Sequence, residues 1–138
     1  TPLYSSAASD VYKRQVSYYL AYQPRRYAYG EPAKFEKIIQ AFPDVPIVMG
    51  HCGMRQGEQV IELARKYSNV YADSSNQTLK MLRKALPVLG KDRLLFGSDW
   101  PTSHQNTPIK IGLKLTKADP EFREKFFWQN AASLLGTK

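Results

Sequence analysis

Three side chains capable of acid–base or metal chemistry lie at the ends of short apolar segments. His51 follows the segment 46–50, Asp73 closes the segment 69–73, and Asp99 follows the segment 93–97. An imidazole can accept or donate a proton near neutral pH, and a carboxylate can bind a divalent cation or take up a proton. These residue types therefore indicate proton transfer or metal-assisted chemistry, provided that the fold brings them together.

The two aspartates also have structural interpretations. An aspartate after a strand is often the N-cap of the next helix, and we predict that role for Asp73, which Ser74 and Ser75 follow. Asp99 has the same alternative, because Pro101 could begin a turn or a helix. For Asp99 we favour the functional interpretation.

The two histidines differ in their sequence context. His51 lies between Gly50 and Gly53, and glycines allow a backbone and a ligand to approach each other closely. We therefore interpret His51 as a functional residue. His104 lies in the polar segment 102–107 and is predicted to be a surface histidine.

Strands and helices alternate along the sequence. The segments 46–50, 69–73 and 93–97 are predicted as buried strands, and the aromatic segment 16–22 as a further strand. Amphipathic patterns predict helices over 31–42, 59–67, 77–89, 109–117 and from a cap at Asp119 to a stop at Gly136. Such alternation predicts an α/β fold with a parallel sheet, whose strands all present their carboxyl ends at one edge. His51, Asp73 and Asp99 should therefore share that edge.

Composition limits the classes of function. The chain of 138 residues carries 20 Lys and Arg against 12 Asp and Glu, but the positive residues are scattered along the predicted helices. Such spacing is typical of solvated helix faces, so we predict no nucleic-acid partner. No apolar segment is long enough to cross a membrane, and no glycine-rich phosphate loop is present. A single cysteine, Cys52, fits a reducing, cytoplasmic compartment.

Four segments carry a family resemblance: AFPDVPIVMGHCG (41–53), NVYADSS (69–75), DRLLFGSDWP (92–101) and NAASLLG (130–136). In this order and spacing they resemble the amidohydrolase-related family of metal-dependent hydrolases, in the branch of the aminocarboxymuconate-semialdehyde-decarboxylase-like enzymes. The resemblance implies a (β/α)8 TIM-type barrel of which this chain is the C-terminal half, strands five to eight. We expect the half-barrel to cover residues 16–138, with 1–15 as a non-native or disordered N-terminal segment.

The resemblance also implies roles for individual residues. His51, after strand six, would orient the reactive water or the substrate, and Asp99, after strand eight, would bind the metal and shuttle protons. The cofactor would be a divalent metal ion, zinc or manganese. Asn130 matches a family position for which we expect a structural hydrogen bond.

Four further residues are candidates for binding a substrate. Arg25, Arg26 and Tyr29 lie in a loop expected at the mouth of the barrel, where guanidinium groups could hold a substrate carboxylate. An ordinary solvated basic loop is the alternative. Trp100 could form a wall of the substrate pocket or pack beneath the last helix.

Several family ligands are missing from this sequence. The family supplies two histidines as His-x-His on strand one and commonly another at the end of strand five, whereas the segment 16–24 contains none. One histidine and one carboxylate do not complete the usual metal site. We therefore expect the chain alone to be inactive, and it need not bind the metal by itself.

The resulting hypothesis is a fragment of a metal-dependent hydrolase that acts on a small carboxylate, lactone or amide through a metal-activated water. The alternatives are a decarboxylase of the same family and a catalytically dead barrel that acts as a binding domain. The expected partner is a small molecule, with a homo-oligomer left open. Half of a barrel would expose strand edges and apolar side chains, which favours self-association.

Overall fold

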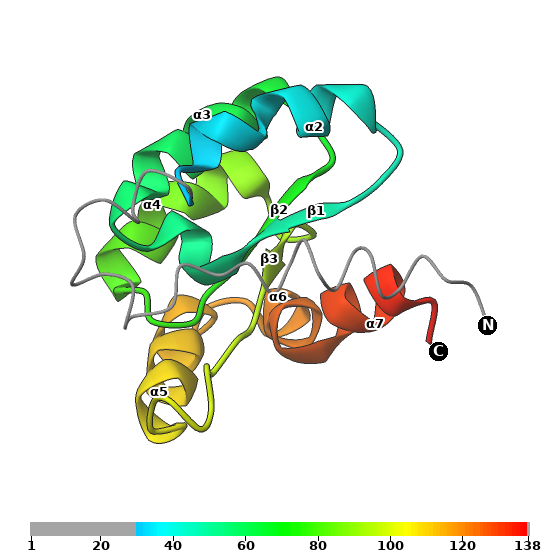
Figure 1. Ribbon diagram of the computed structural model, residues 1–138. Coiled ribbons are helices and arrows are strands. Elements are labelled where there is room, and N and C mark those ends of the chain that lie inside the picture. Colours follow the sequence, from blue (N-terminus) through cyan, green and yellow to red (C-terminus); the bar gives the residue numbers. More distant parts are fainter. Residues whose placement is uncertain (1–29, 138) are drawn as a thin grey trace.

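A computed structural model of the chain describes residues 30–137, which form a parallel sheet flanked by helices (Figure 1). The strands are β1 (Ile47–Met49), β2 (Val70–Asp73) and β3 (Leu94–Leu95), in the order β1-β2-β3. Both neighbouring pairs are parallel. The predicted α/β class is confirmed, and β2 is the central strand of the three. The predicted strand 16–22 lies outside the described residues.

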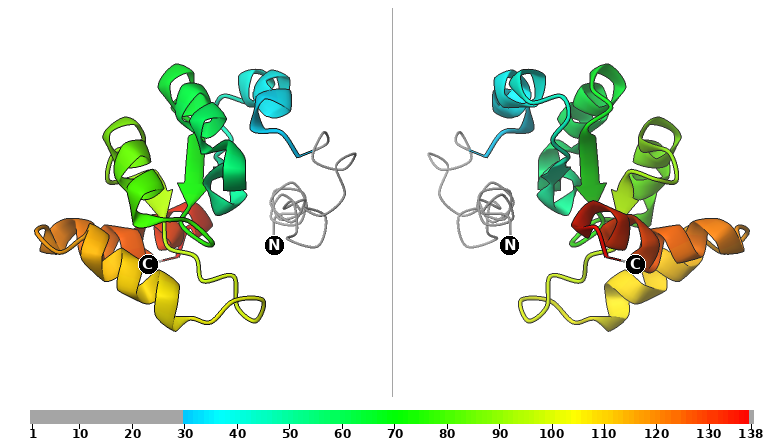
Figure 2. Two further views of the ribbon diagram at one scale, coloured as in Figure 1. Left: turned by 90° about the vertical axis from the view of Figure 1, so that its left-hand side faces the viewer. Right: turned by 90° about the vertical axis from the view of Figure 1, so that its right-hand side faces the viewer.

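Helices connect and cover the strands. They are η3 (Pro32–Phe35), α2 (Glu36–Ala41), η4 (Gly50–Gln56), α3 (Gly57–Lys66), α4 (Leu79–Leu89), α5 (Asn106–Leu115), α6 (Pro120–Glu124), the π-helical η5 (Lys125–Gln129) and α7 (Asn130–Leu135). Both α3 and α4 pack against β2 and against each other, whereas η5 and α7 pack against β3. Figure 2 shows α3 and α4 side by side next to the strands, with the C-terminal helices below them.

The first predicted helix is less regular and less buried than its pattern indicates. The segment 31–42 forms the short η3 followed by α2, and only Ile39 of its predicted apolar face is completely buried. Ile38 is 43% exposed and Phe42 is 56% exposed. The spacing of apolar residues therefore predicted the helix, but it did not predict how much of the apolar face is covered by the rest of the protein.

Strand β3 is shorter than the predicted segment 93–97, because its last amides leave the sheet. The Phe96 N–H donates to the carbonyl of Phe126 at 2.9 Å, and the Gly97 N–H donates to Ser74 Oγ at 3.2 Å. The chain thus leaves the sheet at Phe96, one residue before the glycine, and residues 98 and 99 lie on the loop that follows.

The predicted helix ends are confirmed for the C-terminal segment and shifted for α4. Asp119 caps α6 by accepting the Phe122 N–H, and Gly136 ends α7 in the left-handed conformation. Thr78 is the N-cap of α4, so this helix begins two residues after its predicted start, and it ends at Leu89 as predicted, with Pro87 in its last turn. A proline in the last turn removes only one amide, which explains why the helix tolerates it.

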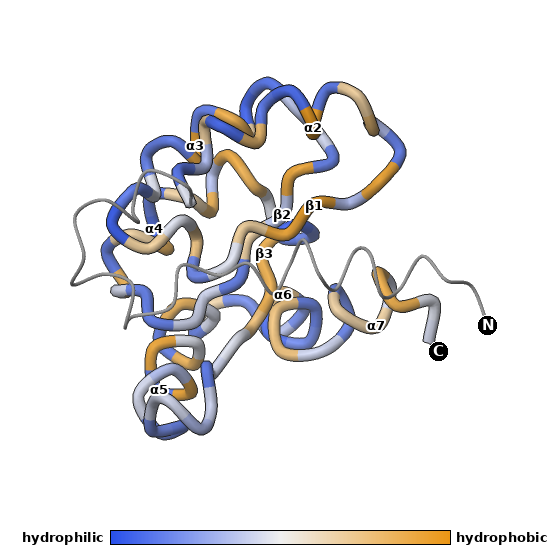
Figure 3. The backbone as a smooth tube through the Cα atoms, viewed as in Figure 1, coloured by the Kyte–Doolittle hydropathy of each residue, from blue (hydrophilic) through white to orange (hydrophobic). Residues whose placement is uncertain are grey.

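The core lies between the strands and the covering helices. The strands contribute buried apolar side chains to this core, and α3 and α4 turn their apolar sides towards them. These strand residues are Ile47, Met49, Val70, Ala72 and Leu94. Figure 3 shows apolar residues along the strands and mostly polar residues on the outer turns of α2 and α3. Within residues 30–137, no helix is long and apolar enough to cross a membrane.

Polar side chains bind main-chain carbonyls at the amino ends of the strands. The Arg93 guanidinium donates to the carbonyls of Ala64, Tyr67, Leu89, Val88 and Val70 at 2.6–3.3 Å. The side-chain amide of Asn69 donates to the carbonyls of Ile39, Phe42 and Val45. The ends of α2, α3 and α4 are thereby tied to the sheet on the edge opposite to His51.

Candidate functional site

His51 lies in a strained loop that directly follows β1. Residues 51–54 all have positive φ angles, with values of 53° at His51, 44° at Cys52, 74° at Gly53 and 54° at Met54. Residues other than glycine rarely adopt this region of the backbone. The Gln77 amide holds this loop by donating to the carbonyls of His51 at 2.5 Å and of Met54 at 2.8 Å. A Cβ at Gly53 would lie 2.6 Å from a methyl carbon of the Val60 side chain, so this glycine makes room for packing rather than for a ligand.

Asp73, at the end of the central strand, is buried beneath the loop of His51. Its Oδ2 accepts the His51 backbone N–H at 3.0 Å, and its Oδ1 accepts the Ser75 N–H at 2.8 Å and the Ser75 hydroxyl. The prediction that Asp73 caps the next helix is wrong, because Thr78 caps α4 and the Asp73 carboxyl points towards β1. Burial raises the pKa of the Asp73 carboxyl, and the bonds from Ser75 and His51 oppose that rise.

The imidazole of His51 contacts Ser75, which lies two residues after Asp73. His51 Nδ1 lies 2.6 Å from Ser75 Oγ, and both side chains are buried. The same hydroxyl also contacts Asp73, so a line of hydrogen bonds runs from the carboxyl through Ser75 to the imidazole. Sequence reasoning took Ser75 only as part of a helix cap and missed this role.

Asp99 lies on the loop after β3, with a left-handed φ of 57°. Its Oδ2 accepts hydrogen bonds from Asn76 Nδ2 at 2.6 Å and from Thr102 Oγ1 at 2.5 Å, and its carbonyl accepts the Thr102 N–H at 2.9 Å. Since α5 begins at Asn106, with Gln105 at its N-cap, Asp99 does not cap a helix. Pro101 instead lies in a turn that begins at Asp99, whose carbonyl also accepts the Ser103 N–H at 3.1 Å. The functional interpretation of Asp99 stays a prediction.

The three predicted residues lie at one edge of the sheet and are joined by the loop after the central strand. Ser75 contacts His51 after β1, and the next residue, Asn76, contacts Asp99 after β3. Neither Ser75 nor Asn76 was singled out as a functional residue from the sequence. The signal that could have found them is their place directly behind the middle strand of a parallel sheet, where one loop can reach both neighbours.

Cys52 lies directly beside His51 and is completely buried. Burial, followed by the negative charge of Asp73, raises the pKa of its thiol to about 12. The thiol is therefore protonated at neutral pH and is a poor nucleophile.

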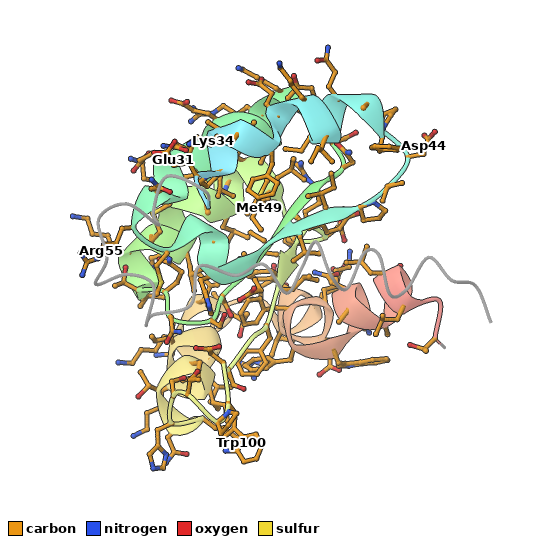
Figure 4. The ribbon with its side chains drawn as sticks, in the orientation of Figure 1. Glu31, Lys34, Asp44, Met49, Arg55 and Trp100 are labelled. Carbon is orange, nitrogen blue, oxygen red and sulfur yellow. The ribbon has the colours of Figure 1, made fainter. Side chains whose placement is uncertain are left out.

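The other predicted site residues stand apart from this cluster. Arg25, Arg26 and Tyr29 lie outside the described residues. Trp100 is 66% exposed and projects beside α5 (Figure 4), so it does not pack beneath the last helix. His104 is exposed, as predicted.

Asn130 has the structural role that the sequence suggested. Its buried side-chain amide donates to the carbonyls of Lys91 at 2.8 Å and Leu94 at 2.9 Å. These bonds attach α7 to the start of β3.

The described residues do not by themselves fit a complete metal site. Within residues 30–137, no three or more His, Cys, Asp or Glu side chains are grouped so that they could hold a metal ion. Asp99 offers one carboxylate that is already oriented by Asn76 and Thr102. Further metal ligands would have to come from other residues.

Solved structures of TIM-barrel amidohydrolases share this fold. A dihydroxybenzoic acid decarboxylase from a Polaromonas species, solved with manganese and 2-nitroresorcinol, is 19% identical, with a TM-score of 0.65 over 99% of this chain and 47% of its own. A zinc-bound amidohydrolase from Burkholderia multivorans is 18% identical, with a TM-score of 0.61 over 83% of this chain and 57% of its own. The 5-carboxyvanillate decarboxylase from Sphingomonas paucimobilis is 18% identical, with a TM-score of 0.52 over 75% of this chain and 37% of its own.

This chain spans about half the length of the first two of these structures, and it covers only part of a barrel. No curated protein matches its sequence significantly. The family model described as Amidohydrolase matches residues 9–137, which is nearly the whole sequence. The chain therefore belongs to the amidohydrolase family.

Proposed function

We propose that this chain provides strands five to eight of an amidohydrolase-type barrel and contributes His51 and Asp99 to the active site of a metal-dependent enzyme. The observation that carries the proposal is that one loop, after the central strand, forms hydrogen bonds with both residues at the carboxyl edge of the sheet. Ser75 orients His51, Asn76 orients Asp99, and these two neighbours belong to one loop. In parallel α/β folds, this edge is where ligands bind.

Asp99 is the residue of this chain that we assign to a divalent metal ion. Relatives with the same fold were solved with zinc and with manganese, which supports a metal of this class. Such an ion would polarise a substrate oxygen or lower the pKa of bound water. In this proposal Asn76 and Thr102 hold the Asp99 carboxylate in place, and the missing ligands come from the first half of the barrel.

We favour decarboxylation of a small carboxylate as the reaction. Two of the solved relatives are named as decarboxylases, of a dihydroxybenzoic acid and of 5-carboxyvanillate. The initial hypothesis of hydrolysis through an activated water remains the second candidate, favoured by the zinc-bound amidohydrolase. Both reactions need a group that accepts or delivers a proton beside the metal, and we assign that task to His51 and Asp99.

The proposal also covers the residues that contact the substrate and the compartment in which the protein acts. Arg25, Arg26, Tyr29 and Trp100 are assigned to substrate binding, and the partner is a small molecule in the cytoplasm. The chain alone is proposed to be inactive, because its metal ligands are incomplete. If the barrel were instead a catalytically dead binding domain, the metal ligands that this chain lacks would also be absent from the longer protein.

The decisive experiment uses the protein encoded when the coding DNA is read upstream of residue 16. A strand with His-x-His in that region supports the metal site, and an intact gene without it contradicts the proposal. Metal content is measured by mass spectrometry for this longer protein, for Asp99→Asn and for the control Asp44→Asn, whose exposed side chain lies before β1. We expect Asp99→Asn alone to lose metal, and unchanged metal content refutes the role of Asp99.

The same preparations distinguish the two reactions. Release of carbon dioxide from 2,6-dihydroxybenzoate reports decarboxylation, and ring opening of a small lactone reports hydrolysis. Activity in the second assay alone would reverse the order of our two candidates.

A further inference from the structure

The hydroxyl of Ser75 has two buried neighbours and only one proton. Its Oγ lies 2.6 Å from His51 Nδ1 and also contacts Asp73 Oδ1 within hydrogen-bond distance. A hydroxyl can donate one hydrogen bond and accept two. The direction of its single proton therefore determines which nitrogen of the imidazole is protonated.

The surroundings of Asp73 favour donation of that proton to the carboxylate. Oδ2 already accepts the His51 backbone N–H at 3.0 Å, and Oδ1 accepts the Ser75 backbone N–H at 2.8 Å. Burial raises the pKa of this carboxyl, but the hydrogen bonds from Ser75 and His51 oppose that rise, and an ionised carboxylate accepts on both oxygens. With the proton of Ser75 directed to Asp73, the lone pairs of its Oγ face Nδ1, which must then carry a hydrogen.

The imidazole is enclosed, since His51 is buried, and its Nδ1 contacts Ser75 Oγ. Its backbone is held on both sides, by Asp73 at the N–H and by Gln77 at the carbonyl. Nε2 forms no hydrogen bond in the part of the chain that the structure describes. Within this part, no side-chain nitrogen or oxygen is both buried and without a partner, so Nε2 keeps contact with solvent.

We propose that Asp73 and Ser75 are positioning residues that fix His51 as the Nδ1–H tautomer and present Nε2 as a hydrogen-bond and proton acceptor. A neutral imidazole in this state receives a proton from a water or a hydroxyl group and does not donate to a substrate oxyanion. The use of Nε2 in catalysis rests on the proposed function, whereas the tautomer itself does not.

The test is nitrogen NMR of the 138-residue chain labelled with ¹⁵N-histidine, recorded at about pH 8, where an ordinary imidazole is neutral. The chain has two histidines, and the exposed His104 serves as an internal reference. We expect a protonated Nδ1 signal and an unprotonated Nε2 signal from His51. The reverse pattern in the wild-type protein would overturn the proposal. Ser75 would then donate its proton to Nδ1, and the proton between Ser75 and Asp73 would have to belong to the Asp73 carboxyl.

Three variants separate positioning from general stability. Ser75→Ala is expected to lose the preference for Nδ1–H, and Ser75→Thr, which retains a hydroxyl, is expected to restore it. Ser74→Ala is the matched control, because the neighbouring Ser74 is also buried but its hydroxyl accepts the Gly97 N–H. An unchanged His51 tautomer in Ser75→Ala, or the same loss in Ser74→Ala, contradicts the proposal.

The result is decided even if Ser75→Ala does not fold, because the wild-type spectrum alone distinguishes the two directions of the proton. The measurement needs neither metal nor substrate. A failed metal test with a confirmed Nδ1–H tautomer would overturn the proposed function but not the positioning role. The opposite combination would overturn the positioning role alone.

Discussion

Alkaline pH should destabilise this fold through one buried thiol. Cys52 is completely buried, and the pKa of its thiol is raised to about 12, from the ordinary value of 9.0. Between these two values the unfolded chain releases the thiol proton while the folded chain keeps it. The folded state then binds more protons, so the free energy of unfolding falls as the pH rises through this window.

The size of the effect follows from the shift. Each unit between the two pKa values is worth about 1.4 kcal/mol, so the thiol should cost about 2 kcal/mol at about pH 10.5 and up to about 4 kcal/mol near pH 12. Cys52→Ala removes the titrating group but keeps a Cβ in the same left-handed backbone. The variant should be less stable at neutral pH and should lose less stability on the way to alkaline pH.

Urea unfolding of both proteins at about pH 8 and pH 10.5 measures this difference, because the tyrosines and lysines that also titrate are common to both. We expect the wild-type protein to lose about 2 kcal/mol more than Cys52→Ala over this range. Equal losses would refute the reasoning. So would thiolate absorbance that appears near pH 9 in the folded wild-type protein.

Three further predictions concern packing and association. Asn130→Ala removes the donor to two carbonyls at the start of β3. The free energy of unfolding should fall by about 2 kcal/mol, and a loss below about 0.5 kcal/mol in urea unfolding would contradict this. Gly97→Ala would place a Cβ 2.9 Å from Asp73 Oδ1 and 3.1 Å from Ser75 Cβ. It should cost about 1–3 kcal/mol in the same assay, and unchanged stability would show that the site has room. The isolated chain should self-associate in sedimentation velocity, since large apolar side chains such as Phe42 are exposed, and a monomer at all concentrations would argue against a half-barrel.

The sequence predicted the placement of His51 and Asp99 because that placement follows from topology. Parallel strands that alternate with helices all have their carboxyl ends at one edge of the sheet, and a polar residue directly after such a strand must lie at that edge. The helices and most of their ends were also predictable, since caps such as Asp119 act through local hydrogen bonds.

The remaining features depend on contacts between distant segments. Asp73 reads locally as a helix cap, but its carboxyl is taken by the backbone of His51 and by Ser75. Directly after the early end of β3, the Phe96 N–H donates to the carbonyl of Phe126, thirty residues further along the chain. Neither partner is visible in a window of a few residues, and periodicity does not report on hydrogen bonds. The left-handed backbone angles of residues 51–54 could not be predicted from the sequence for the same reason, because contacts with distant residues such as Gln77 hold that loop.

The hydrogen bonds from Arg93 and Asn69 to main-chain carbonyls affect how such a chain can change during evolution. These bonds hold the helices to the strands at the amino edge, while His51 and Asp99 stand on loops at the opposite edge. Loop residues can therefore be exchanged, and new substrates tried, without removing the bonds that keep the layers together. The converse also holds, because loss of Arg93 would impair every possible activity equally and would be mistaken for a catalytic defect in a screen that measures turnover alone.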